Sequence, residues 1–567
     1  MPNVRPSGIS SRLKLPEYGK AVIYQMLPRL FSNTNPDCVP NGTIEQNGSG
    51  KLNDITSGVL KQIRDLGVTH VWYTGIIEHA TATDYSAYGI RPDHPKVVKG
   101  KAGSPYAIKD YYDIDPDVAV DVPNRMKEFE SLVSRTHRAG LRVVMDFVPN
   151  HVARCYHSDA APAGVEDFGL HDDNTKFFSP ANNYYYIPRQ QFYPGFDIGD
   201  YYEFPAKASG NDCFTAFPGR NDWYETVKLN YGVDYGDGTC HFSPVPSTWI
   251  KMLRILRFWA SKGVDAFRCD MAFMVPVDFW EWAIPQVKDK YPSVEFIAEI
   301  YDVNQYRNFL YRAGFDYLYD KVNLYDTLRD VQTHFHSAAR ITDCWQRIDG
   351  IGDRMLNFLE NHDEQRFASA QYAADATKVL PSLVVSSMIS NAPFMLYAGQ
   401  ELGEPAADAE GFSGADGRTT IFDYWSVPTL RRWLTQCSTS HELALRGMYR
   451  HVLRLLNSES ALYAGKFFDL MYVNFENPDF SPHSNYAFLR YDDDAVLLIA
   501  VNFSDRPMNL RINVPQLAVD MSGAKPGAQM ARELISGRRA KKTFSSEEPF
   551  ATEISPWGAV VWKLSKK

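Results

Sequence analysis

The segment GVDAFRCDMA, residues 263–272, begins like a buried β-strand and ends with two charges. Arg268 and Asp270 stand two positions apart, so on a strand their side chains point the same way. Charged side chains are rarely buried without a partner or a chemical task. The pair would also fit a structural ion pair, so its meaning depends on what the other strands carry.

Three further apolar stretches end in acidic or imidazole side chains. DFVPNH carries Asp146 and His151, FIAEIY carries Glu299, and ENHDEQR carries His362 and Asp363. Each residue alone also fits a helix cap, a solvated acid or a core histidine. Together, at the ends of successive strands, they are hard to explain by packing, because like charges gathered at one rim lower stability unless a function needs them.

Converging carboxylates, an arginine, two histidines and 14% aromatic residues fit glycoside hydrolysis. That reaction needs one carboxylate as nucleophile and another as general acid and then base. A metal-dependent hydrolase is a distant alternative, because the sequence has no H-E-x-x-H and the two histidines lie about 210 residues apart. Hydride transfer would need a glycine-rich dinucleotide loop, which the sequence lacks.

A recurring unit positions these side chains: an amphipathic helix ends in a glycine, and an apolar strand follows at once. Four copies place Gly67, Gly140, Gly263 and Gly314 where a helix C-cap needs a left-handed residue. Alternating helices and strands predict parallel βαβ units. With four further apolar stretches, eight strands are expected, starting near residues 21, 69, 142, 264, 294, 315, 355 and 393.

Eight units over about 450 residues predict an α/β fold, the (β/α)8 TIM barrel, whose active sites form at the C-terminal ends of the strands. A doubly wound open sheet is the alternative. The barrel is expected at 1–151 and 246–460, with an inserted domain B at 152–245 after the third strand, because a structureless loop of that length is unusual. The stretch 461–567 has strands separated by turns without helices, which predicts a C-terminal antiparallel β-sandwich.

Composition narrows the class of partner and the location. The formal charge of −9, from 59 basic and 68 acidic residues without long runs, argues against nucleic acid or an anionic membrane as partner. The first 20 residues lack an apolar core, and the most apolar window, 379–399, contains two prolines, so neither a signal peptide nor a membrane span is expected. Seven scattered cysteines predict free thiols and a cytoplasmic location, or a secreted or periplasmic one if a signal was removed. The sequence contains no pattern that predicts the oligomeric state.

The motifs DFVPNH, GVDAFRCD, FIAEIY and FLENHD, in this order, resemble the four sequence regions of the α-amylase family of glycoside hydrolases. AVIYQMLPRLF and SPYAIKDYYDIDP resemble further segments of that family. The resemblance implies a retaining hydrolase that cleaves α-1,4-glucosidic bonds in maltooligosaccharides or starch-type α-glucans. A transglycosylase of the same family shares every catalytic residue and is the first alternative. A non-catalytic carbohydrate-binding relative is the second, and it would be free to lose the acids.

The resemblance also implies roles for single residues. Asp270 would be the nucleophile, Glu299 the general acid and then base, and Asp363 would hold the distorted sugar through its hydroxyls. Arg268 would orient Asp270 and keep it ionised at neutral pH. Because the mechanism would be retaining, the carboxyls of Asp270 and Glu299 are expected roughly 5–5.5 Å apart.

Further residues would bind the substrate. By the same resemblance, His151 and His362 would bind sugar hydroxyls, Tyr106 would stack under the sugar ring, and Asp146 would be a supporting acid.

Departures from the family pattern concern calcium and linkage. Many α-amylases have a Lys-His pair after the nucleophile that helps to hold calcium, but here Phe273 and Met274 stand there. Asn150 matches one calcium ligand and the others are not located, so no cofactor is required by the pattern and Ca²⁺ stays open. The segment TVKLNYGVDY resembles another family motif but has Asn230 where an acid is common, which leaves the choice between α-1,4 and α-1,6 bonds open.

Overall fold

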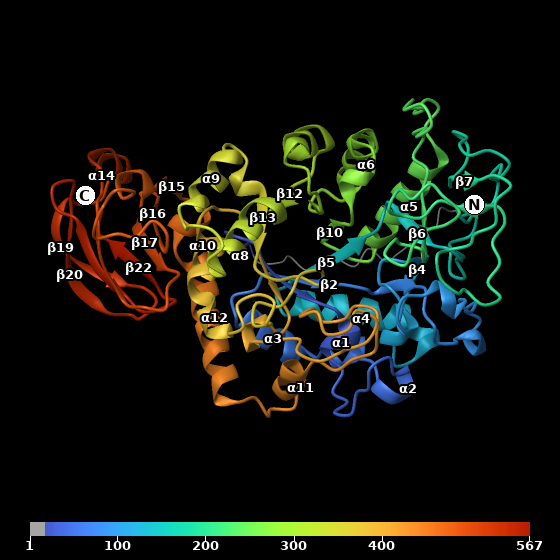
Figure 1. Ribbon diagram of the computed structural model, residues 1–567, viewed down its shortest axis with the longest axis horizontal. Coiled ribbons are helices and arrows are strands. Elements are labelled where there is room, and N and C mark those ends of the chain that lie inside the picture. The colour runs from blue at the N-terminus through green and yellow to red at the C-terminus, as the bar shows by residue number, and fades with distance from the viewer. Residues whose placement is uncertain (1–16, 567) are drawn as a thin grey trace, which may run out of the picture.

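The computed structural model describes residues 17–566 (Figure 1), so the expectation about a signal peptide falls mostly outside the described residues. Eight strands, all paired in parallel, close into a barrel in the order β1-β14-β13-β12-β11-β10-β5-β2. They are β1 (Val22–Met26), β2 (His70–Tyr73), β5 (Arg142–Phe147), β10 (Ala266–Cys269), β11 (Glu295–Ala298), β12 (Tyr317–Tyr319), β13 (Met355–Phe358) and β14 (Phe394–Tyr397). Each begins within two residues of its predicted start, and the (β/α)8 barrel is confirmed.

Helices surround the barrel and alternate with its strands. The main ones are α3 (Ser57–Arg64), α4 (Arg125–Arg138), α5 (Ser247–Ser261), α6 (Val277–Lys290), α8 (Asp326–Gln332), α9 (Arg340–Arg347), α10 (Leu380–Met388) and α12 (Ser440–Ser458). In α4, Phe129, Leu132 and Val133 recur at helical spacing and are buried, so this face packs on the barrel. Gly140 follows with a φ of +76°, and the other three predicted C-cap glycines also have positive φ.

Large side chains fill the inside of the barrel below the rim. Because strand residues alternate between the two faces, one set from each strand points inward. The inward cluster consists of Ile23, Trp72, Val144, Ala266, Ile297, Tyr319, Tyr325, Leu356, Phe358 and Met395. The barrel is therefore a packed core, and chemistry is confined to its upper end.

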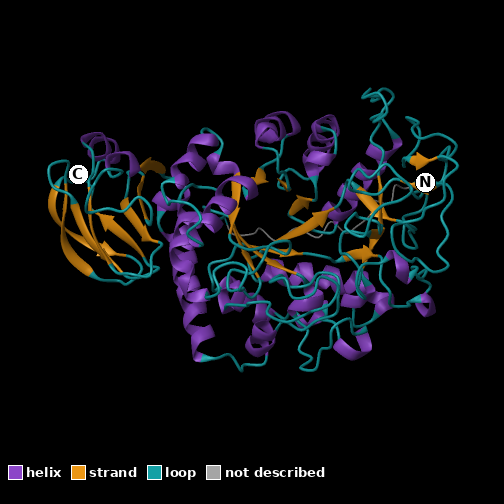
Figure 2. Cartoon of the chain, in the orientation of Figure 1, coloured by secondary structure: helices purple, strands orange, loops and turns teal. Residues whose placement is uncertain are grey.

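The segment between β5 and β10 is mostly loop (Figure 2). Its short strands are β6 (His151–Ala153), β7 (Tyr186–Ile187), β8 (Ala206–Lys207) and β9 (Thr226–Lys228), and β6 pairs with β9 while β7 pairs with β8. A small apolar cluster around Phe192 and Ile198 packs within it. We call residues 152–245 the insert; its status as a separate domain stays a prediction.

The C-terminal part is an antiparallel β-sandwich beside α9, α10 and α12 (Figure 1). One sheet has the order β15-β16-β17-β22-β19-β20, and β18 pairs with β21. The strands are β15 (Lys466–Asp469), β16 (Asn485–Tyr491), β17 (Val496–Asn502), β18 (Met508–Ile512), β19 (Gly527–Glu533), β20 (Arg539–Phe544), β21 (Phe550–Ile554) and β22 (Ala559–Leu564). The boundary at 461 stays a prediction, since α13 (Ser460–Tyr463) spans it.

The expectation that this part has no helix is wrong. Helix α14 (Gln516–Ser522) connects β18 to β19. Its buried residues Ala518, Val519 and Ser522 have helical spacing, and Gly523 ends it with a φ of +65°. This helix is only seven residues long, or about two turns, which is too short for helical periodicity to stand out among the neighbouring strands.

The apolar window 379–399 forms α10 and β14 within the barrel layer. Among residues 17–566 there is no helix of the length and apolar character that a membrane crossing requires. All seven cysteines are free.

Two glycines with nearly the same φ give a test of close packing. Gly103 has a φ of +81°, and a Cβ there would lie 1.7 Å from the carbonyl oxygen of Ala80. Gly89 has a φ of +82° and no atom within 4 Å of such a Cβ. We expect Gly89→Ala to lower the free energy of unfolding by about 1 kcal/mol, the cost of the left-handed conformation, and Gly103→Ala by about 3 kcal/mol. Urea unfolding midpoints measure the difference; equal midpoints would show that the Ala80 contact is easily relieved.

Candidate active site

Strand pairing brings the charged residues to one rim. Strand β10 carries Arg268 near its end, and Asp270 follows the strand. Its pairing with β5 sets Arg268 beside Asp146, and its pairing with β11 sets Arg268 beside Ile297. Glu299 comes two residues after Ile297 and therefore lies at the same upper end.

One buried guanidinium contacts three carboxylates. Nη1 of Arg268 lies 2.8 Å from Oδ1 of Asp270 and 3.2 Å from Oδ1 of Asp146. Nη2 lies 2.8 Å from Oε2 of Glu299. Arg268 is 1% exposed, and three aromatic rings of the site lie 5.3–5.4 Å from its Cζ. Arg268 is therefore the common partner of the acids that the sequence singled out.

The acids around Arg268 do not all ionise easily. Burial raises the pKa of Asp270 well above its usual value, the charge of Glu299 raises it further, and Arg268 opposes both. The expectation that Arg268 keeps Asp270 ionised at neutral pH omitted the first two effects, and the net shift is upward. Burial also raises the pKa of Asp146 to about 6. A cluster of three carboxyls around one cation thus retains a proton at higher pH than separate acids would.

Glu299 is held by two further donors. The backbone N–H of Met271 donates to Oε2 at 2.8 Å, and the hydroxyl of Tyr301 donates to Oε1 at 2.5 Å. A hydroxyl can either donate or accept, so Tyr301 fits both the ionised and the protonated form of Glu299. A carboxyl that donates a proton and later accepts one needs such a partner, because the partner must bind both of its protonation states.

Tyr106 and His362 form a stacked pair beside the acids. Their ring centroids lie 5.2 Å apart, and the Tyr106 hydroxyl lies 2.5 Å from Nε2 of His362. Nδ1 of His362 lies 2.7 Å from the Gln25 amide nitrogen, which donates, so the ring proton belongs on Nε2. Burial, with the charge of Arg268, lowers the pKa of His362 to about 3, so the ring is neutral. Asp363, with its side chain 42% exposed, lies at the mouth, with Oδ2 3.2 Å from the same Nε2.

His151 lies on the other side of the site, directly before the insert, where it begins β6. Its ring centroid lies 5.2 Å from that of Trp223. Burial and the nearby charges of Lys228 and Lys99 lower the pKa of His151 to about 3. Both candidate histidines are therefore neutral and suited to hydrogen bonds with hydroxyls rather than to proton transfer.

These side chains surround a pocket of about 280 Å³, at the small end of the range for ligand sites. It is lined by Lys99, Ser104, Tyr106, His151, Trp223, Glu225, Thr226, Asp270, Met271, Glu299, Tyr301, Asp363, Ile421 and Phe422. Of the predicted residues, Arg268, Asp146 and His362 lie buried behind this lining. Asn150 is not part of it.

The sequence did not reveal several lining residues. Nζ of Lys99 lies 3.1 Å from Oε1 of Glu225, whose other oxygen is buried without a hydrogen-bond partner. Trp223 and Glu225 come from irregular backbone of the insert, where no periodic pattern marks a position. Tyr301 stands two residues after Glu299, and the alternation of a strand end would have been a signal for it.

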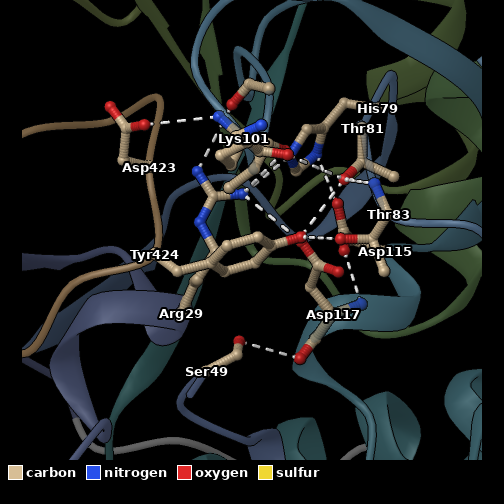
Figure 3. Close-up of polar contacts among 12 residues, drawn as sticks. Arg29, Ser49, His79, Thr81, Thr83, Lys101, Asp115, Asp117, Asp423 and Tyr424 are labelled. Atoms are coloured by element: carbon tan, nitrogen blue, oxygen red, sulfur yellow. Dashed lines mark hydrogen bonds and ion pairs between the residues drawn. The ribbon is translucent and has the colours of Figure 1, made fainter. Parts of the chain in front are cut away.

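A buried polar network around Arg29, His79, Asp117 and Tyr424 is shown in Figure 3. Nη2 of Arg29 donates to the carbonyl oxygen of Ile421 at 2.7 Å, and Nη1 lies 2.9 Å from Nε2 of His79. Arginine has only donors, so this nitrogen of His79 accepts. The hydroxyl of Tyr424 donates to Oδ2 of Asp117 at 2.9 Å. The loop after β14 is thereby tied to the loops that follow β1 and β4 (Ile108–Ile114).

The surroundings of Asn150 do not fit calcium. Its Oδ1 accepts from the Lys228 ammonium, which also lies 2.7 Å from Oδ1 of Asp212. Calcium needs six to eight oxygen ligands, and a lysine already neutralises the carboxylate here. Residues 17–566 contain no group of three or more His, Cys, Asp or Glu side chains placed to hold a metal ion.

Known proteins resemble this chain in sequence and in fold. The family model "Alpha amylase, catalytic domain" matches residues 25–197. The chain is 21% identical over 499 residues to Alpha-amylase 2 of Dictyoglomus thermophilum, which covers 87% of this chain and 71% of that protein. It is 22% identical over 404 residues to a cyclomaltodextrin glucanotransferase of Geobacillus stearothermophilus, covering 67% and 49%. A maltogenic α-amylase structure from Thermotoga neapolitana matches with a TM-score of 0.62 and 18% identity, covering 97% of this chain and 99% of that one.

The family model and the named relatives indicate an enzyme of glycoside hydrolase type, and the closed parallel barrel with acids at its rim fits that class. These matches support the α-amylase family, to which the chain is similar in sequence and in fold, and the relatives named above include an α-amylase and a glucanotransferase. Whether the protein is a hydrolase or a transferase depends on whether water or a sugar hydroxyl reaches the pocket as acceptor.

Variants of Arg268 test the charge balance of the site. Arg268→Gln removes the positive charge that lowers the pKa of Asp270, so that pKa rises further. The ionised fraction then falls at a given pH, and we expect the acid limb of the kcat/KM profile to move up by about 1–3 pH units. Arg268→Lys keeps the charge and should move it less. Profiles on a soluble glucan measure this, with circular dichroism confirming that both variants fold; equal shifts would show that charge is not what Arg268 supplies.

Proposed function

We propose that the protein is a retaining glycosidase that cleaves α-1,4-glucosidic bonds in maltooligosaccharides and starch-type α-glucans. The observation that carries this is the shared contact of Arg268 with Asp270 and Glu299 in a pocket that Tyr106 also lines. Two carboxyls held by the two ends of one guanidinium are close together, as a retaining pair requires. Their separation of roughly 5–5.5 Å stays a prediction.

In the first step, the carboxylate of Asp270 attacks the anomeric carbon while Glu299 gives its proton to the departing glycosidic oxygen. The C–O bond breaks and a glycosyl ester of Asp270 forms. In the second step, Glu299 takes a proton from water, and the water oxygen replaces the ester oxygen of Asp270. The rotating hydroxyl of Tyr301 accommodates Glu299 before and after each transfer.

The remaining predicted residues would hold the sugar. Tyr106 offers an aromatic surface, and neutral His151, which lines the pocket, offers hydrogen bonds to hydroxyls. His362 lies behind the lining, so it would reach a sugar hydroxyl only if Tyr106 or Asp363 released its Nε2. Asp363, exposed at the mouth, would bind hydroxyls of the distorted ring. The unpartnered oxygen of Glu225 is a further acceptor in the wall. A pocket of about 280 Å³ is small, so most of a longer glucan chain would lie outside it.

The second candidate is an α-glucan transglycosylase, which differs only in that a sugar hydroxyl replaces water in the second step. Its support is the relative named cyclomaltodextrin glucanotransferase and the apolar wall of Ile421 and Phe422, a surface on which an acceptor sugar would displace water.

Conservative variants test the two carboxyl roles. Asp270→Asn is nearly isosteric and should abolish turnover, by about 10⁴-fold or more, with the thermal midpoint little changed. Glu299→Gln should lose less on an aryl glycoside with a good leaving group than on maltoheptaose, because such a leaving group needs no proton. Equal losses on both substrates would contradict the acid role, and an active Asp270→Asn would contradict the nucleophile.

Product analysis with maltoheptaose decides between hydrolysis and transfer. Shorter products with matching new reducing ends are expected. Products longer than the substrate, without new reducing ends, would instead establish the transferase. No change on maltoheptaose, but cleavage of an α-1,6-linked glucan, would overturn the linkage assignment.

A further inference from the structure

A buried lysine lies where the insert meets the barrel rim. Lys228, the last residue of β9, pairs with His151 in the β6–β9 ladder, and its side chain is 2% exposed. Its ammonium donates to Oδ1 of Asn150 and to the carbonyl oxygen of Met274, 3.2 Å away. It also lies 2.7 Å from Oδ1 of Asp212. Two hydrogen-bond acceptors and one carboxylate oxygen in ion-pair contact thus surround the ammonium.

These three oxygens belong to three separate segments. Asn150 follows β5 at the barrel rim, Asp212 belongs to the insert, and Met274 ends the short turn after the candidate nucleophile Asp270. One ammonium therefore joins the rim, the insert and the loop behind the nucleophile. A divalent cation bound by oxygen ligands from the same three segments could connect them in the same way.

The charge is compensated locally. Burial lowers the pKa of Lys228, and the carboxylate of Asp212 opposes that shift. An unpaired ammonium in this position would be strongly unfavourable, whereas the pair with Asp212 leaves no net charge. A calcium ion at Asn150 would have to displace the lysine.

Lys228 also determines how Asn150 is turned. Because an ammonium only donates, Asn150 presents its oxygen to Lys228 and its Nδ2 to the opposite side. That Nδ2 donates to the carbonyl of Gly210 at 2.7 Å and lies 3.1 Å from Nδ1 of His151. Nδ1 of His151 is thus an acceptor, so the proton of this neutral ring lies on Nε2.

We propose that Lys228 is a built-in cation that replaces a metal ion in this protein: it joins the insert to the rim and, through Asn150, sets the tautomer of His151. Lys228 is a positioning residue, since it does not line the pocket. The part of the proposal that concerns His151 and the substrate rests on the proposed function; the part that concerns joining does not.

Lys228→Met keeps the length of the side chain and removes the charge. The matched control is Lys109→Met: Lys109 is also 2% exposed, and its Nζ lies 3.0 Å from Oδ2 of Asp93. Both variants should lower the thermal midpoint, but only Lys228→Met should lower kcat/KM on maltoheptaose, by about 10–100-fold. Equal activity losses in the two variants, or none in Lys228→Met, would overturn the positioning role.

Rescue by an added cation tests the replacement directly. In Lys228→Ala, CaCl2 or methylammonium chloride should raise the thermal midpoint, relative to NaCl at the same ionic strength, because the three oxygens are left unpaired. The unsubstituted protein should keep its midpoint in the presence of a chelator. The proposal fails if the chelator lowers that midpoint and calcium restores it, or if neither cation affects Lys228→Ala.

A double-mutant cycle tests the path through His151. If Lys228 acts by orienting His151, the variant with both Lys228→Met and His151→Ala should be no more than about 2-fold less active than His151→Ala alone. Losses that multiply would contradict that path. If the unsubstituted protein cleaves no glucan, the proposed function fails, while the thermal midpoints still decide whether Lys228 replaces a metal.

Discussion

The site depends on one buried positive charge. Arg268 contacts Asp270, Asp146 and Glu299 while being 1% exposed, so it is the cation that makes three neighbouring carboxyls tolerable inside the protein. Removing one partner of such a cluster leaves uncompensated buried charge, which is strongly destabilising. The aromatic rings around the guanidinium add to its stabilisation without using its donors. The acids are thus positioned and stabilised by the same side chain.

Buried cations also hold the loops that complete the pocket. The insert and the loop after β14 have little regular structure and cannot be positioned by strand pairing alone. Lys228 joins the insert to the rim through oxygens of three segments. Arg29, which follows β1, joins the β14 loop to His79, and Tyr424 of that loop reaches Asp117 after β4. Each cation supplies several donors in fixed directions, and its burial prevents water from competing for them. The barrel strands therefore position the acids, and the polar contacts of the buried cations position the loops around them.

The charges divide the residues of the pocket into two chemical groups. Asp270 and Asp146 have raised pKa values, because burial and mutual repulsion outweigh Arg268. His151 and His362 are neutral, because burial and neighbouring cations oppose their protonation. In the proposed function, proton transfer is therefore assigned to the carboxyls and hydrogen bonding to the histidines. This division suits a neutral substrate rich in hydroxyls.

The sequence by itself determined the barrel and most of the rim, because both depend on local patterns. Helical spacing, glycine caps and apolar runs set the eight strands, and the side chains that follow a strand lie at a known edge. The position of Asp270 in the sequence could not reveal the direction of its pKa shift, since that depends on burial and on Glu299 across the rim. Nor could the sequence reveal that Asn150 bonds to Lys228, 78 residues away, rather than being free to bind calcium. The α14 helix is too short, and the backbone around Trp223 and Glu225 too irregular, to leave a recognisable pattern in the sequence. Only the tertiary structure shows that this helix forms and that these two side chains line the pocket, because burial and contacts between distant segments determine both.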